Sequence, residues 1–484
     1  MNVKAISSNV GRALLVSALF MFVSMLVSLV YGMDAGFGPL LISFIITAIF
    51  GSFPFIFVKG SLEVSQRDGF FTIVLSWLLS FIFGMLPYVL YGGEFTLINA
   101  WYESVAGYTT TGSTILTDIE ALPKSLLFWR SSTHFIGGLG VVVYLLVILP
   151  DDSPFRLKLS QMEISSLSRE GYHYKSAKLV KIIFYVYFGL TIVATLLYWL
   201  AGMSMFDAIN HAFSVASTGG FSTKNSSIAS FGSPVIDVIS LILMIIAGMH
   251  FGLIYSVIAT RSFKPLKNSV FFYYIGSFAM MSLLVFINLM VKGGYGDWAL
   301  ALKDAAFNVA AYSTTTGFAC TDNANWPMFS GAVLMFACFQ CACSGSTTGG
   351  VKIDRMLILW KSIGREIKSK LHPTLVVPVR INKRPISEKM VYTSLNYITL
   401  YVVLLLISAL ALLLSGMDAN DAISGTFASL GNCGPGLGNL IGSQGNFDSF
   451  NGLQKFVFTI DMFLGRIEIY PFLLVLAMMF KKEV

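Results

Sequence analysis

Charged residues are scarce in this sequence, at 12% of 484 residues, whereas 55% are hydrophobic and the mean hydropathy is +0.75. An ordinary soluble domain carries about twice that proportion of charge. The composition therefore excludes a soluble globule and predicts a chain that crosses a membrane many times. The net charge of +7 makes no basic domain, because the 32 lysines and arginines are spread along an apolar chain, so we expect no nucleic-acid partner.

Cysteine and histidine are few, with five of each. The cysteines are Cys320, Cys338, Cys341, Cys343 and Cys433. Their odd number and apolar surroundings disfavour a disulfide framework. The three that cluster at 338–343 lack a fourth zinc ligand at a sensible spacing, which favours small-residue helix packing. No nucleophile, base and orienting residue form a set, so the sequence does not predict an enzyme.

Apolar windows long enough to cross a bilayer, roughly 20 residues each, occur ten times. They lie at about 12–32, 38–58, 72–92, 127–150, 179–202, 234–260, 269–292, 329–360, 392–416 and 453–480. The first window follows Lys4 and Arg12 like a signal peptide, but it is long and lacks a clear cleavage site, so we expect it to be retained. The sequence thus predicts an all-α polytopic membrane protein with ten transmembrane helices.

Basic residues mark one side of the membrane. The connection from Lys361 to Met390 carries eight lysines and arginines against Glu366 and Glu388, so the positive-inside rule places it in the cytoplasm. The connection with Arg261, and the basic segment 156–178, fall on the same side when the windows are counted. An even number of crossings places both termini in the cytoplasm.

A fourfold repeat with one internal spacing links the outer connections. An Asx-Ala pair stands thirteen residues before a glycine four times, as a subtraction of residue numbers shows. The pairs begin at Asn99, Asp207, Asp304 and Asp421, and the glycines are Gly112, Gly220, Gly317 and Gly434. Because Asn and Asp are good N-cap residues, we expect these four to cap short helices that run inward and end just before the glycine.

The residues before these glycines are small or polar, and none is a carboxylate. Backbone carbonyls and hydroxyls can replace the hydration shell of a monovalent cation, and glycine allows the backbone angles that such a ring requires. The carboxyl ends of the four helices add about half a negative charge each. The expected ion-binding residues are Thr110, Thr111, Gly112 and Ser113, then Thr218, Gly219 and Gly220, then Thr315, Thr316 and Gly317, and finally Asn432, Cys433 and Gly434.

This pattern resembles the superfamily of potassium transporters built from fused potassium-channel-like units. The strings Thr109 to Ser113, Ser217 to Phe221, Thr314 to Phe318 and Asn432 to Gly436 are similar to those of its TrkH branch, which two extra amino-terminal windows also favour. The resemblance implies a two-helix hairpin at 1–68 and pore repeats at 69–165, 166–265, 266–390 and 391–484 around a central pore.

The same resemblance implies potassium uptake across a bacterial inner membrane by a homodimer in contact with lipid. It also implies a cytoplasmic, nucleotide-binding regulatory subunit of the TrkA kind. Potassium would be the only ligand, with no nucleotide bound by this chain, because 345–352 lacks the Gly-Lys-Ser/Thr ending of a phosphate loop. The resemblance also implies that the four glycine-containing segments form a selectivity filter. In the superfamily, a serine in place of the first filter glycine goes with sodium permeation, so Gly112 implies a preference for potassium.

The eighth window contains a stretch that is poor in helix formers. It consists of Gly345, Ser346, Thr347, Thr348, Gly349 and Gly350, preceded by Cys343 and Ser344. We expect a loop at membrane depth, where irregular backbone is tolerated if it lines a cavity. Arg466 lies 32 residues past its filter glycine and would meet this loop, and the resemblance implies that the two form a gate. The alternatives are that Arg466 snorkels to the cytoplasmic face or pairs with Glu468.

Two further alternatives stay open. A coupled K⁺/H⁺ or K⁺/Na⁺ symporter would bind its cation near the midplane, although such proteins usually show inverted or twofold repeats. The basic connection from Lys361 to Lys389 can dock the regulatory subunit or serve only the positive-inside rule.

Overall fold

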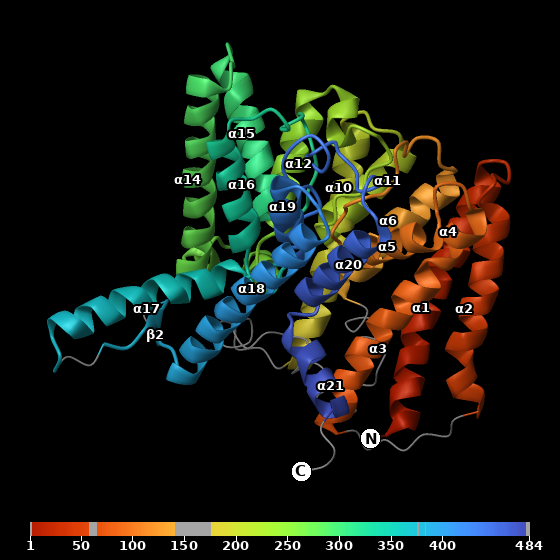
Figure 1. Ribbon diagram of the computed structural model, residues 1–484, viewed down its shortest axis with the longest axis horizontal. Coiled ribbons are helices and arrows are strands. Elements are labelled where there is room, and N and C mark those ends of the chain that lie inside the picture. Colours follow the sequence, from red (N-terminus) through yellow and green to blue (C-terminus); the bar gives the residue numbers. More distant parts are fainter. Residues whose placement is uncertain (1, 58–64, 141–175, 375–376, 383, 481–484) are drawn as a thin grey trace.

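The computed structural model describes residues 2–57, 65–140, 176–374, 377–382 and 384–480, and this part is a helical bundle (Figure 1). Six helical segments are long and apolar enough to cross a membrane. They are α1 (Val3–Val30), α2 (Phe37–Phe57), α3 with α4 (Gln66–Gly84 and Leu86–Tyr91), α10 (Ser176–Leu200), α14 (Ser269–Lys292) and α18 (Glu388–Leu414). A single hairpin of two-residue strands, β1 (Arg380–Ile381) and β2 (Arg384–Pro385), is the only sheet among the described residues.

The remaining predicted windows are not continuous helices. The window 234–260 is divided into α12 (Pro234–Ala247) and α13 (Phe251–Thr260), bent by 99°, and 453–480 into α20 (Gly452–Arg466) and α21 (Tyr470–Phe480), bent by 106°. If each bent pair crosses the membrane, the number of candidate spans rises to eight.

The other two windows supply only partial helices. The window 127–150 contributes α6 (Lys124–Leu139), and its residues 141–150 lie outside the described part of the chain. The window 329–360 is divided between α16 (Met328–Gln340) and α17 (Ile353–Leu371), and α17 runs away from the bundle at a steep angle to α16 (Figure 1). The sequence predicts an interruption within the window 329–360, but it does not predict that α17 leaves the direction of α16 after this interruption.

The breaks after α12 and after α20 have local causes that the sequence analysis missed; it predicted only the break at 343–350. After α12, the His250 side chain accepts a hydrogen bond from the Gly252 amide and so starts α13 in a new direction. After α20, Glu468 and Ile469 both adopt positive φ angles of 59° and 58°, which an α-helix cannot contain. The predicted interruption of the helix is confirmed, because no helix occurs between Gln340 and Ile353; its depth in the membrane stays a prediction.

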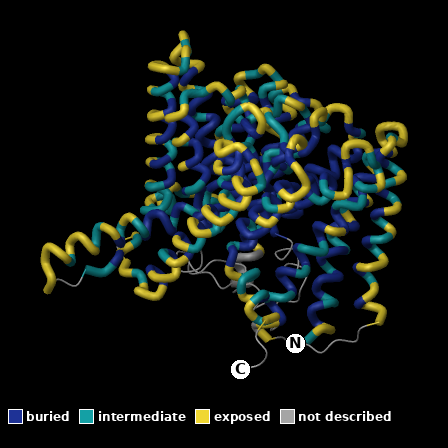
Figure 2. Tube along the Cα trace, in the orientation of Figure 1, coloured by how far each residue is buried: buried dark blue, intermediate teal, exposed yellow. Residues whose placement is uncertain are grey.

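Four short helices end in the interior of the bundle, and most residues in their second halves are buried, as the largely buried centre in Figure 2 shows. They are α5 (Leu97–Tyr108), α11 (Met205–Ser217), α15 (Trp298–Ser313) and α19 (Ala419–Leu430). The short helix η1 (Ser227–Phe231) follows the second of them.

The predicted caps of these helices are wrong. The N-caps are Thr96, Ser204, Asp297 and Asp418, whose side chains accept the first free amide hydrogens. Asn99, Asp207 and Asp421 stand three residues inside their helices, and Asp304 stands seven residues inside.

Two of the displaced Asx residues, Asp207 and Asp304, instead contact the segment that follows the glycine of their own repeat. Asp207 Oδ1 accepts a hydrogen bond from Thr223, three residues after its filter glycine, at 2.6 Å. Cys320 occupies the same place after the third glycine and approaches Asp304 Oδ1 at 3.8 Å. The fixed spacing of thirteen therefore reflects, in these two cases, a tie between the helix and the segment that returns from the glycine.

The two basic connections meet on one side of the bundle. The Ser269 amide, just after η2 (Lys264–Leu266), donates to Asn382 Oδ1 at 2.7 Å, and the Asn382 amide donates to Ser269 Oγ at 3.3 Å. In Figure 1, α1 begins and α21 ends at one end of the bundle, as an even number of crossings requires. Residues 156–175 of the predicted basic segment 156–178 lie outside the described residues.

The predicted repeat boundaries relate to these elements in different ways. The boundary at 68/69 falls in the first turn of α3, that at 265/266 falls in η2, and that at 390/391 falls within the first turn of α18. The boundary at 165/166 lies outside the described residues.

Candidate ion-conduction site

Each of the four short helices ends in the same unusual backbone conformation. Two residues before the glycine, one residue adopts a left-handed conformation with φ of 53° or 54°. These residues are Thr110, Thr218, Thr315 and Asn432, and the glycines that follow have φ of 79° (Gly112), 88° (Gly220), 69° (Gly317) and 97° (Gly434). Because a positive φ on alternate residues reverses the peptide planes in turn, such a segment can turn successive carbonyl groups toward one side.

The four segments approach one another in a closed cycle. A β-carbon added to Gly112 would meet the carbonyl oxygen of Gly219, the residue before the second glycine. The same relation joins Gly220 to Thr316 and Gly317 to Cys433. The cycle closes where a β-carbon on Gly434 would lie 2.5 Å from the carbonyl oxygen of Thr111. Four carbonyl oxygens from distant parts of the chain therefore lie around one centre, each against the glycine of a neighbouring segment.

Side-chain hydrogen bonds stiffen these segments in related ways. In the first and third, hydroxyl pairs lie 2.8 Å apart, Thr109 with Thr111 and Thr314 with Thr316. In the fourth, the Asn432 amide replaces a hydroxyl and donates to Thr111 Oγ1 at 3.1 Å, which ties the last segment to the first. The Tyr102 hydroxyl, from α5, donates to Ser113 Oγ at 3.1 Å. All the predicted filter residues thus lie together.

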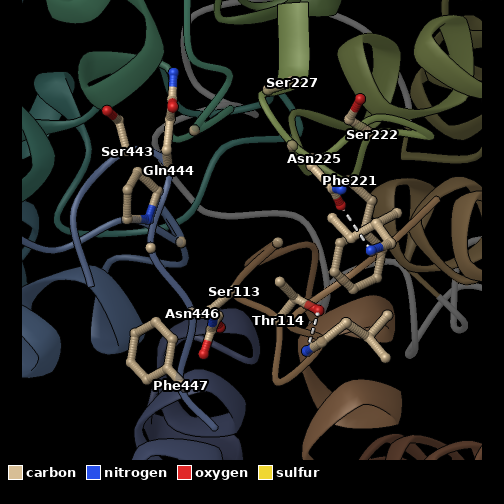
Figure 3. A pocket seen from close by; sticks show the side chains of 18 of the residues that line it. Ser113, Thr114, Phe221, Ser222, Asn225, Ser227, Ser443, Gln444, Asn446 and Phe447 are labelled. Carbon is tan, nitrogen blue, oxygen red and sulfur yellow. Dashed lines mark hydrogen bonds between the residues drawn. The ribbon is translucent and has the colours of Figure 1, made fainter. Parts of the chain in front are cut away.

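A cavity of about 110 Å³ opens above the four glycines, and all four line it. Figure 3 shows Thr114, Phe221 and Asn225 on one side of this cavity and Gln444 and Phe447 on the other. No described lining residue is an acid, and Arg130 and Lys224 are its charged members. The lining therefore suits a monovalent cation that is held by carbonyl dipoles better than a divalent cation that needs carboxylates.

The rim of the cavity is held by bonds between the segments that follow the first two glycines. The Asn225 side chain donates to Asp118 Oδ1 at 2.8 Å and accepts from the Ile119 amide at 2.7 Å. Its hydrogen bond lowers the pKa of the exposed Asp118 carboxyl below its ordinary value, because it stabilises the charged form. Lys224 and Glu120 form an exposed ion pair at 2.9 Å beside it.

A buried ion pair behind the filter was missed by the sequence analysis. Arg130 Nε, from α6, lies 2.7 Å from Glu103 Oε1, from α5, and both side chains are at most 1% exposed. Glu103 accepts from Thr114 Oγ1 at 3.0 Å and from the Ile115 amide at 3.2 Å, while Arg130 donates to the Ser222 carbonyl at 3.3 Å. The pair therefore braces the first two filter segments from outside. The signal was present, because charges inside apolar windows are rare and usually have a partner.

Replacing Glu103 with glutamine should destabilise the protein markedly, because it leaves the buried Arg130 charge without its partner. Loss of one member of a buried pair costs about 3–5 kcal/mol. The change is measured as a decrease of several degrees in the midpoint of thermal denaturation in detergent. Glu120→Gln, which breaks the exposed pair with Lys224, is the matched control and should cost at most about 1 kcal/mol. Equal midpoints for the two variants would contradict a bracing role for Glu103.

The loop between α16 and α17 lies directly against the filter segments. Thr218 Oγ1 donates to Thr347 Oγ1 at 3.2 Å, and the Gly349 amide donates to Thr315 Oγ1 at 3.2 Å. A β-carbon on Gly349 would also lie 2.7 Å from Asn432 Oδ1. The loop thus reaches the second, third and fourth filter segments at their left-handed residues, on the side away from the outer cavity.

Arg466 joins this loop to the first repeat. Its guanidinium donates to the Thr347 carbonyl at 2.6 Å and to the carbonyls of Gly137 and Gly138 at 2.6 and 2.9 Å. The last two carbonyls belong to the final turn of α6, where the helix dipole favours a positive charge. The structure therefore brings the loop and Arg466 together, two elements that lie 119 residues apart in the sequence.

Glu468, which the sequence analysis considered as an alternative partner of Arg466, forms ion pairs with two other residues. Its carboxylate lies 2.6 Å from Arg355 Nη2 and 3.2 Å from Lys352 Nζ, at the start of α17. The Arg355 guanidinium also lies over the Tyr397 ring, at 3.9 Å from its centroid. This cluster fastens the end of the loop to the break between α20 and α21, whereas Arg466 donates to the Thr347 carbonyl of the loop and to two carbonyls of α6.

Comparison with known proteins gives consistent matches. The chain matches the TrkH family of cation transport proteins over residues 39–293 and 278–483. The Trk system potassium uptake protein TrkH of Escherichia coli K12 is 33% identical over 390 residues, 80% of each chain, and that of Vibrio parahaemolyticus is 32% identical over 386 residues, 79% of each. The crystal structure of the potassium transporter TrkH from Vibrio parahaemolyticus matches 98% of this chain and 99% of its own, with a TM-score of 0.88 and 31% identity. The chain therefore belongs to the TrkH family.

Proposed function

We propose that this protein takes up potassium through a selective path along the centre of the four filter segments. The observation that carries the proposal is the closed cycle in which each filter glycine lies against the carbonyl oxygen of the next segment. Such a ring supplies uncharged oxygens from four sides, as a dehydrated monovalent cation requires. Glycine is required in each place, because its φ is positive and a β-carbon would displace a ligand oxygen. The potassium uptake named for the relatives supports the choice of ion.

The loop 345–350 and Arg466 form the proposed gate. The loop contacts three filter segments from below, and Arg466 holds it through the Thr347 carbonyl while anchored on the end of α6. A guanidinium in the path repels a potassium ion, and the loop backbone occupies the space through which the ion would leave. In the proposed open state, the hydrogen bonds of Arg466 to the loop are broken and the loop moves away from the filter.

The wider arrangement follows from the family and from the charge pattern. We propose pore repeats at 69–165, 166–265, 266–390 and 391–484 after an amino-terminal hairpin, with the second boundary outside the described residues. The protein would lie in a bacterial inner membrane as a homodimer with both termini in the cytoplasm. The amphipathic α17 and the hairpin β1–β2 extend from the bundle on the basic side and offer a surface for a TrkA-like, nucleotide-binding subunit (Figure 1).

Reversal potentials distinguish a channel from a coupled symporter. In proteoliposomes with opposed potassium and proton gradients, a channel should reverse at the potassium equilibrium potential, because a continuous path moves the ion alone. The reversal potential of a K⁺/H⁺ symporter would shift with the proton gradient, and that of a K⁺/Na⁺ symporter would shift with the sodium gradient. We expect no shift on a change of either second gradient. A shift that follows one of them would replace the channel mechanism with the symport alternative.

A further inference from the structure

A second cavity lies on the opposite side of the filter, among the basic connections. Its volume is about 510 Å³, which is within the range of small-ligand sites. The walls come from the break between α12 and α13, the connection through η2, the start of α14, the hairpin β1–β2 and the start of α18. The proposed ion path does not use it.

The mouth of this cavity is positively charged. Lys264, Lys267 and Arg384 line it and are exposed. Among the residues that the structure describes, neither lysine forms an ion pair. Asp354 is the one acid among the described lining residues; it is half-buried, and its carboxylate accepts a hydrogen bond from the Ser344 amide at 2.6 Å, so it is already engaged. The accessible charge of the mouth is therefore cationic.

The inner part of the cavity is mainly apolar. Leu253, Val270 and Phe271 line it, together with Met249, Ile386 and Met390. A free inorganic anion would leave this surface in contact with water. A molecule with an anionic head and an apolar body would cover it while it neutralises the mouth.

We propose that this cavity binds an anionic amphiphile. A phosphate-type head group would lie on Lys264, Lys267 and Arg384, and the apolar body would pack against Leu253, Val270 and Phe271. Basic pockets between helices on the cytoplasmic side of a membrane have the chemistry for anionic lipid head groups, and a soluble organic phosphate shares that head-group chemistry. The membrane that surrounds the bundle makes a phospholipid the source that we favour.

The cavity also borders the residues on either side of the loop 345–350. Cys343 and Asp354 line it, and the Cys343 amide donates to the Gly248 carbonyl at 3.1 Å. The Phe251 amide in turn donates to the Gly345 carbonyl at 3.1 Å. A ligand in the cavity would therefore pack against the segment from which the proposed gate begins. This consequence rests on the proposed function, whereas the binding site itself does not.

Lipid binding to the purified full-length protein tests the site. We expect phosphatidylglycerol to bind more tightly than phosphatidylcholine in native mass spectrometry from detergent. The double variant Lys264→Ala/Lys267→Ala should weaken phosphatidylglycerol binding about 25-fold, since a lysine near an anionic head group contributes about a factor of five. The matched control Lys368→Ala/Lys370→Ala removes the same charge from the exposed face of α17, outside the cavity, and should change binding by less than about twofold.

A second variant separates the apolar wall from the charge. Val270→Trp should weaken phosphatidylglycerol binding although the charge is unchanged. Size-exclusion chromatography must first show that this variant elutes as the wild type does. If the variant does not fold, the comparison of the two lysine pairs tests the proposal instead. Equal weakening by both lysine pairs, or equal binding of the two lipids, would overturn the proposal. So would displacement of the lipid by glycerol phosphate at an equal concentration, because a head group alone would then account for the affinity.

Discussion

Replacing Gly112 with serine should lower the preference for potassium over sodium by about tenfold or more. The residue has φ of 79°, which costs a residue with a β-carbon roughly 1–2 kcal/mol, and the added carbon would meet the carbonyl oxygen of Gly219. That oxygen must move. If its displacement changes the free-energy difference between potassium and sodium in the filter by only about 1.4 kcal/mol, the permeability ratio of the two ions changes tenfold. We expect sodium permeation to rise because the smaller ion tolerates a distorted ring through which water can enter. The ratio is measured from bi-ionic reversal potentials or from competing rubidium and sodium fluxes in proteoliposomes.

Gly416→Ser is the matched control for this experiment. Gly416 has a similar φ of 84°, but a β-carbon there has no atom within 4 Å, and the residue lies in the connection between α18 and α19. The variant Gly416→Ser has the same conformational cost of a β-carbon at positive φ but no contact with a filter carbonyl, so its selectivity should equal that of the wild type. Unchanged selectivity in Gly112→Ser would contradict the assignment of Gly112 to the filter. A loss in both variants would assign the effect to general destabilisation.

Replacing Arg466 with alanine should increase potassium leak by at least about tenfold in the absence of any regulatory subunit. The guanidinium makes three hydrogen bonds to carbonyls that join the loop to the end of α6. A hydrogen bond with a charged partner contributes about 1.5–3 kcal/mol, so losing the bond to the loop alone shifts the closed population about tenfold. Removing the positive charge also removes the repulsion on the ion. Potassium or rubidium efflux from proteoliposomes measures the leak.

Two further variants define what Arg466 does. Arg466→Lys keeps the charge but lacks the planar fork that spans two elements, so its leak should be intermediate if both charge and bridging matter. Arg365→Ala removes an arginine from the exposed pair with Glu388 on the basic side and should leave the flux unchanged. Wild-type flux in purified Arg466→Ala would contradict the gate, whatever the result for the filter glycine.

The membrane character, the four spaced glycines and the interruption at 343–350 were predictable from the sequence. The thickness of the hydrocarbon sets the length of an apolar window, which holds without knowledge of the fold. Glycine at Gly112 and its three equivalents marks positive φ, which depends on the residue type itself. The loop follows from three glycines and four hydroxyl side chains within eight residues, since each lowers helix stability locally.

The caps show where local reasoning fails. Asn99 and Asp207 are good cap residues, yet Thr96 and Ser204 precede them by three residues and are also good caps. Sequence propensity does not choose between the two, whereas the structure does. Asn99 instead accepts a hydrogen bond from Lys455 Nζ at 2.8 Å, and Asp207 accepts one from Thr223. Partners outside the helix engage these side chains, so the amides of the first turn are left to the earlier residues.

The sequence by itself determined the kind of protein, its apolar segments and the four places where glycine must occur, because these depend on solvent and on single-residue geometry. Only the tertiary structure decided which carbonyl meets which glycine and how Glu103 and Arg130 brace the filter. Those features depend on contacts between residues that lie tens to hundreds of positions apart. Arg466 combines both kinds of information, since its charge in an apolar window was visible in the sequence, but its three acceptors belong to α6 and to the loop. A buried charge must find partners, and only packing specifies which ones are within reach.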